Sequence, residues 1–147
     1  MPSSDPGESA EQHAHYRWFC DITTRWMDND IYGHVNNVAY YSYFDSAMNL
    51  FLIRVGGLDI AESSTIGVVV ESHCVYRESL AYPDLLRAGL RVNKLGNRSV
   101  TYGIGIFREH GDEACAHGYV THVFVDRKTR RAVPIPDSVR QALLTIV

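Results

Sequence analysis

Residues 25–45 read RWMDNDIYGHVNNVAYYSYFD, and this stretch predicts a loop that leads into a long apolar helix. Its first half, up to Asn37, is dense in Asp, Asn and Gly, which are the residues that turns favour. Apolar side chains then recur every three or four positions as far as Val55, the period of a helix with a buried face. Asn36 or Asn37 can cap the start of this helix, and Gly56 can end it.

The segments around this helix alternate apolar and polar residues, which is typical of strands with one buried face. One strand is expected before the loop, at about 17–25, and four after the helix, at 68–76, 86–93, 100–106 and 114–125. Short turns such as Gly96-Asn97 predict antiparallel hairpins, and Pro136 is placed to begin a short second helix. The order predicts an α+β fold in which a curved antiparallel five-stranded sheet wraps around a central helix. Exposed sheet edges favour pairing with a second copy of the chain, so we expect a homodimer or homotetramer.

The length and composition are those of one globular domain. The chain has 147 residues, of which 46% are hydrophobic and 21% are charged. Residues 1–15 lack apolar periodicity and are expected to form a flexible N-terminal tail, which leaves 16–147 as the folded domain. The net charge of −3 gives no general attraction to nucleic acid or to an acidic membrane, so neither is an expected partner.

The cysteines and the N-terminus indicate a cytoplasmic protein. Cys20, Cys74 and Cys115 are widely spaced and odd in number, which favours free thiols in a reducing compartment. The first twelve residues have no basic segment followed by an apolar one, so no signal peptide is expected. No apolar run approaches the ~20 residues that span a bilayer.

The loop before the helix also carries residues that could act together on a carbonyl group. Asp30 lies seven residues before Asn37, with Gly33 between them, so its carboxylate can fold back over the helix start. A helix start offers unpaired N–H groups and the positive end of the helix dipole. Such donors polarise a carbonyl oxygen, while a nearby carboxylate attacks the carbonyl carbon or activates water. The alternative is that Asp30 only caps a turn.

The run from Asp30 to Tyr40, DIYGHVNNVAY, resembles the 4-hydroxybenzoyl-CoA thioesterase family and its Tol–Pal-associated acyl-CoA thioesterase relatives. The resemblance covers about residues 17–140 and includes later features of the family, namely Tyr76, Pro83-Asp84, LGNRS at 95–99 and AVPIP at 132–136. It implies a hotdog fold and an enzyme that hydrolyses an acyl-CoA to a carboxylic acid and CoA. No metal or other cofactor is expected, because a thiolate leaves readily.

The resemblance also implies roles for individual residues. Asp30 would be the catalytic carboxylate, as base or nucleophile, and the backbone N–H of Asn37 would polarise the thioester carbonyl. Many relatives have histidine at the position of Asn37, so any part played by that side chain is missing here. Gly33, Tyr40 and Ser99 are assigned to substrate binding on the same grounds. The site is expected between protomers, with one subunit giving Asp30 and the other part of the CoA groove.

Two basic residues are expected to contact the CoA phosphates. The stretch from Asp126 to Arg131 holds four basic residues in six, and the resemblance places Arg131 and Arg98 near nucleotide contacts. The alternative is a solvated hairpin end.

Other functions and other carboxylates find less support in the sequence. No G-x-S-x-G or G-x-G-x-x-G motif is present, and the histidines lack the spacing of a metal site. A non-catalytic acyl-CoA-binding or sensor domain remains the rival function, since fold does not fix function. Within the loop Asp28 is the other candidate carboxylate. Because the family spacing selects Asp30, Asp28 is expected to be dispensable for activity.

Overall fold

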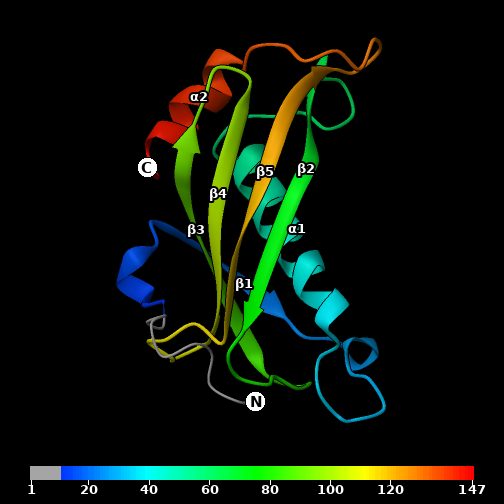
Figure 1. The fold of residues 1–147 in the computed structure, drawn as a ribbon, viewed down its shortest axis with the longest axis vertical. Helices are drawn as coiled ribbons and strands as arrows, with labels where there is room; N and C mark the ends of the chain where they lie inside the picture. The colour runs from blue at the N-terminus through cyan, green and yellow to red at the C-terminus, as the bar shows by residue number, and fades with distance from the viewer. Residues whose placement is uncertain (1–10) are drawn as a thin grey trace.

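The computed structural model describes residues 11–147, in which one long helix packs against one face of a five-stranded sheet (Figure 1). The elements are η1 (His13–His15), β1 (Trp18–Thr23), η2 (Trp26–Asp28), α1 (Asn37–Arg54), β2 (Thr65–Tyr76), β3 (Leu85–Leu95), β4 (Ser99–Arg108), β5 (Ala116–Asp126) and α2 (Asp137–Leu144), where η denotes a 3-10 helix. The expected order of strand, long helix, four strands and short helix is therefore confirmed.

The strands lie in the order β1-β3-β4-β5-β2, and every neighbouring pair is antiparallel. β3, β4 and β5 follow one another as hairpins, whereas β2 reaches the far edge of the sheet beside β5. Register shifts interrupt the pairing after Val69 and after Val92, and such irregularities bend a strand and increase its twist. A curved antiparallel sheet around one helix is the hotdog architecture that the sequence resemblance implies.

The larger hydrophobic core lies between α1 and the inner face of the sheet. The buried residues of α1 are Tyr40, Tyr43, Phe44, Ala47, Met48, Phe51 and Leu52. Val38 belongs to the expected apolar stripe but is 71% exposed, whereas Tyr43 and Ala47 are buried. This helix is apolar on most of its circumference, so its sequence period does not decide which side meets the sheet.

The edge strand β2 exposes apolar side chains. Val68, Val69 and Val70 are 36%, 49% and 60% exposed, and β5 pairs with only one edge of the strand. No strand within residues 11–147 pairs with the other edge, which runs beside a row of valines. Such an edge is a ready surface for another strand.

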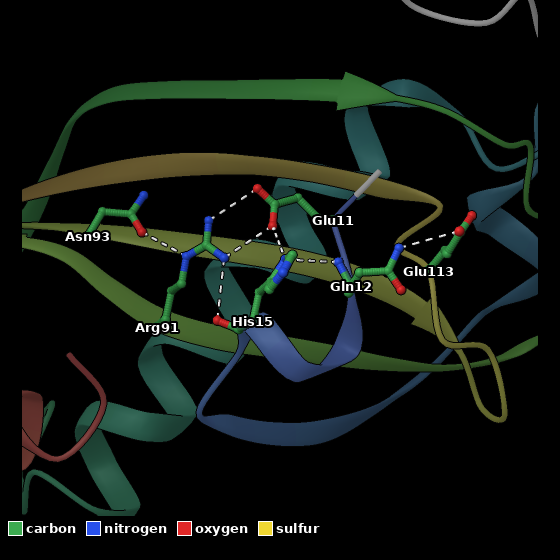
Figure 2. A network of polar contacts seen from close by, with 6 residues as sticks. All are labelled: Glu11, Gln12, His15, Arg91, Asn93 and Glu113. Carbon is green, nitrogen blue, oxygen red and sulfur yellow. Dashed lines mark hydrogen bonds and ion pairs between the residues drawn. The ribbon is translucent and has the colours of Figure 1, made fainter. Parts of the chain in front are cut away.

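The outer face of the sheet is crossed by residues 11–16, which we call the N-terminal strap. Residues 1–10 of the expected flexible tail lie outside the described part of the chain, but the strap packs closely on β3 and β4. Tyr16 is 5% exposed, and its ring occupies the space that side chains would need at Gly89 and Gly105. The Arg91 guanidinium donates to the two carboxylate oxygens of Glu11 at 3.2 and 3.3 Å (Figure 2).

The C-terminal helix covers one end of the sheet. Its buried residues are Val139, Ala142 and Leu143, while Leu144 is 47% exposed. The next buried residue is Ile146, whose carbonyl accepts the N–H of Val92 at 2.8 Å. No helix within residues 11–147 is long and apolar enough to cross a membrane.

Candidate active site

The loop between β1 and α1 closes on itself just before the helix starts. The N–H of Asn36 donates to the carbonyl of Asp28 at 2.8 Å, and the N–H of Asp30 donates to the carbonyl of His34 at 2.9 Å. The turn between Asp30 and His34 contains a residue in the left-handed region, which is Gly33 with φ of 80°. Asp30 is therefore held in a short closed loop at the start of α1.

One oxygen of Asp30 is used by the loop and the other is free. Oδ1 accepts the N–H of Tyr32 at 2.8 Å, an Asx turn that fixes the direction of the side chain. Oδ2 has no hydrogen-bond partner among residues 11–147, and the residue is only half-buried. Asp30 therefore adopts an Asx turn, the structural role that was its alternative, and still has one carboxylate oxygen without a partner among the described residues.

The first N–H groups of α1 lie at the end of this loop. Asn36 is the cap, since its Oδ1 accepts the N–H of Val38 at 3.0 Å. Asn37 is the first helical residue, and its N–H has no acceptor among the described hydrogen bonds. The hydroxyl of Tyr76 donates to the Asn37 carbonyl at 3.2 Å and so joins β2 to the helix start. A half-buried carboxylate with one unpartnered oxygen and an N–H without an acceptor among the described residues thus lie at the two ends of one closed loop.

Two grooves flank the start of α1. The smaller, of about 240 Å³, is lined by Val35, Asn37, Tyr40, Tyr76, Glu78 and Ser79. The larger, of about 490 Å³, runs between α1 and β2 and is lined by Val38, Tyr41, Ser42, Asp45, Met48, Val69, Ser72 and Val120. Val38 follows Asn37 directly, so the larger groove begins next to the free N–H.

Of the candidate residues in the Asp30–Tyr40 motif, Asn37 and Tyr40 line the smaller groove, and Tyr40 is buried. Tyr40 is 3% exposed and packs edge-on against Tyr76 at 5.0 Å between ring centroids. Burial raises its pKa to about 12, so the hydroxyl stays protonated at neutral pH. Its side chain borders the smaller groove, which makes it a wall of the site.

Arg98, Ser99 and Arg131 lie far from Asp30 within one chain. Figure 1 shows the β3–β4 turn and the segment after β5 at one end of the sheet, and the loop before α1 at the other. Arg98 and Arg131 are exposed and their backbones share a corner, since the Arg98 carbonyl accepts the N–H of Phe124 and the Arg131 carbonyl that of Asp126. One protomer therefore does not bring the two arginines to Asp30.

Sequence reasoning missed a set of three residues behind the loop, Arg25, Asp28 and Tyr43, which we call the Asp28 clamp. Asp28 is 4% exposed. Its Oδ2 accepts the Tyr43 hydroxyl at 2.7 Å and the Arg25 N–H at 2.9 Å. Its Oδ1 accepts two N–H groups of the Arg25 guanidinium at 3.1 and 3.3 Å. Only the spacing of Arg25 and Asp28 is a local signal, because Tyr43 lies 15 residues away.

The clamp keeps Asp28 ionised and Tyr43 protonated. Burial raises the pKa of Asp28, but the hydrogen bonds from Tyr43 and Arg25 and the charge of Arg25 outweigh it, so the net pKa is below its ordinary value. Burial and the bond to Asp28 raise the pKa of Tyr43. Asp28 is thus a carboxylate whose acceptor positions are filled, which leaves Asp30 as the accessible carboxylate of the loop.

The histidines of the described chain do not form a metal site. No group of three or more potential ligands is arranged for a metal ion within residues 11–147. His122 is buried beside Tyr102, at 5.1 Å between ring centroids, and burial lowers its pKa to about 4. It is therefore neutral at pH 7.

Comparison with known proteins agrees with this architecture. The family model of the thioesterase-like superfamily matches residues 24–143. The chain belongs to the thioesterase-like superfamily. The long-chain acyl-CoA thioesterase FadM of Escherichia coli is 27% identical over 133 residues, which are 86% of this chain and 96% of FadM.

Solved structures also superpose along most of the chain. The crystal structure of the PA5185 protein from Pseudomonas aeruginosa has a TM-score of 0.93 and 49% identity, and the match covers 94% of this chain and 96% of that one. The PA2801 protein of the same species, described as a putative thioesterase, has a TM-score of 0.81 and 27% identity, over 87% of this chain and 98% of that one. Membership of this superfamily supports thioester hydrolysis as the reaction class.

Proposed function

We propose that this protein hydrolyses acyl-CoA thioesters, with Asp30 as general base or nucleophile and the N–H of Asn37 as the donor to the carbonyl oxygen. The observation that carries the proposal is the free oxygen of Asp30 in a loop closed onto the start of α1, whose first N–H is also free. The resemblance to 4-hydroxybenzoyl-CoA thioesterases suggests an aromatic acyl group, whereas the likeness to FadM suggests a long aliphatic one.

The chemistry can follow either of two balanced routes. As a base, Asp30 takes a proton from water while the water oxygen bonds to the thioester carbon; the C–S bond then breaks and CoA leaves as a thiolate. As a nucleophile, Asp30 itself bonds to that carbon, CoA leaves, and water hydrolyses the resulting anhydride. In both routes negative charge develops on the carbonyl oxygen, where the Asn37 N–H and the helix dipole stabilise it.

The acyl group is proposed to lie in the larger groove. The groove starts at Val38 and follows α1 to Met48, a span of about 15 Å at the helical rise of 1.5 Å per residue. Its walls include Val38, Met48, Val69 and Val120, which suit a hydrocarbon chain or ring. Because it begins one residue after Asn37, an acyl group that fills it places its carbonyl beside the N–H.

A homodimer formed through β2 would complete the CoA groove, and a homotetramer would pair two such dimers. If two copies of β2 pair antiparallel, the β3–β4 turn of one protomer lies at the same end as the Asp30 loop of the other. Arg98 and Arg131 of one protomer would then face the nucleotide of a substrate bound at the partner. The phosphates of CoA match these exposed guanidinium groups.

The proposal is tested by measuring thiol release from a series of acyl-CoA substrates, aliphatic and aromatic, with quantification of the free acid. Equal amounts of thiol and acid, dependent on enzyme concentration, are expected for the preferred acyl class. Saturable acyl-CoA binding without release of either product would instead support a binding or sensor domain.

A further inference from the structure

The Asp28 clamp fixes the loop to the body of α1. Tyr43 lies six residues after Asn37, on the buried side of the helix, and its hydroxyl reaches the Asp28 carboxylate at 2.7 Å. The carbonyl of the same Asp28 accepts the N–H of Asn36. Side chain and backbone of one residue thus tie the base of the loop to two points of one helix.

Asp30 is only two residues beyond this attachment. The opposite side of the loop is held separately, because Asn29 Oδ1 accepts the N–H of Tyr82 at 3.0 Å and the Val35 N–H donates to the Leu80 carbonyl at 2.7 Å. These contacts attach the loop to the segment before β3, whereas the clamp attaches it to α1. The helix that carries the Asn37 N–H therefore also carries the group that positions Asp30.

We propose that Asp28 and Tyr43 are positioning residues, which hold Asp30 at the distance from the Asn37 N–H that the reaction requires. This rests on the proposed function and gives Asp28 a part that the sequence did not predict. A carboxylate accepts about four hydrogen bonds, and Asp28 already has four, so it acts through Asp30 and not on substrate. Misplacing a reacting group by ~1 Å can cost about 100-fold in rate.

The kinetic signature follows from that role. Tyr43→Phe removes one donor from a buried carboxylate and loosens the link between loop and helix. We expect kcat to fall about 10-fold or more. KM should stay within about 2-fold, because neither residue contacts the substrate. Asp28→Asn keeps an oxygen for the Tyr43 hydroxyl but weakens the contact with Arg25, so its loss in kcat should be of the same kind.

A double-mutant cycle with Asp30→Asn separates positioning from general destabilisation. If Tyr43 acts through Asp30, the Tyr43→Phe change should cost less than about 2-fold once Asp30 is already Asn. If Tyr43 acts independently, the two losses should multiply. The same cycle made with Asp28→Asn decides the question should Tyr43→Phe fail to fold.

Tyr102→Phe is the matched control. Tyr102 is fully buried on β4, and its hydroxyl has no hydrogen-bond partner among the described residues, so the same atom is removed far from the loop. It should keep the parental kcat. The positioning role would be overturned if the losses in kcat of the two single variants multiplied in the double variant. It would also be overturned if folded Tyr43→Phe and Asp28→Asn both kept the parental kcat. Parental kcat in Asp30→Asn would instead overturn the proposed mechanism, so the two failures are distinct.

Discussion

Replacing Asp30 by asparagine should abolish most of the activity while leaving the fold intact. The Asp30 carboxylate makes one hydrogen bond in the described chain, from the Tyr32 N–H at 2.8 Å, and an asparagine oxygen accepts the same bond. The main-chain bond to His34 does not involve the side chain. The free energy of unfolding should therefore change by less than about 0.5 kcal/mol, as for surface substitutions.

The chemical loss should be far larger. An amide neither takes a proton from water nor attacks a thioester, so the contribution of a positioned base disappears. That contribution is typically 100-fold to about 10,000-fold in kcat, or roughly 3 to 5 kcal/mol of barrier. The expected outcome is a protein with parental melting temperature and kcat lowered by about two orders of magnitude or more.

The assay is steady-state thiol release, with thermal melting of each variant. Asp21→Asn is the matched control, because Asp21 lies on β1 with a side chain 91% exposed and an ion pair of 3.7 Å to Arg87. It should keep the parental kcat, as a screened surface pair contributes little. Near-parental kcat in folded Asp30→Asn would refute the mechanism.

Three further predictions concern the substrate, the assembly and pH. Arg98→Ala or Arg131→Ala should raise KM more than it lowers kcat, and the effect should shrink with acyl-pantetheine; an equal loss with both substrates would indicate a folding role. Val70→Lys, which places a charge in the exposed edge of β2, should shift the protein toward monomer in light scattering and reduce activity; an unchanged mass would exclude this edge as the interface. The pKa of His122 is lowered from 6.5 in the unfolded chain to about 4 in the folded one. As the pH falls, the unfolded chain therefore takes up this proton at a higher pH than the folded chain, and the free energy of unfolding should fall by up to about 3 kcal/mol between pH 6.5 and 4. His122→Leu should flatten that part of the pH profile of melting, and an unchanged profile would assign the pH dependence to other groups.

The sequence predicted the elements well because their signals are local. Period-two alternation located strands such as β3 and β4, and the run of valines at 68–70 located β2, although β2 begins earlier, at Thr65. The capping asparagine and Gly56 bounded α1 for the same reason. The buried side of α1 was not predictable, since Val38 and Phe44 are equally apolar and only the position of the sheet separates them.

In the site, too, the local features were predictable from the sequence and the contacts between distant residues were not. The Asp30–Gly33–Asn37 spacing is contained in eight residues, so a sequence motif can carry it. The hydrogen bond between Asp28 and Tyr43 depends on how the loop folds back over the helix, so the spacing of the two residues in the sequence does not predict it. The N-terminal strap is a second case, because Glu11 meets Arg91 across 80 positions of sequence.

The N-terminal strap also limits how another sheet can pack against this one. Two sheets that pack back to back approach to about 10 Å and need their outer surfaces bare. Here Tyr16 fills the space above Gly89 and Gly105, and the Arg91 guanidinium lies over its ring at 4.7 Å. The outer surface above β3 and β4 is therefore sealed from within a single chain. A second sheet could contact those strands only if residues 11–16 were first displaced.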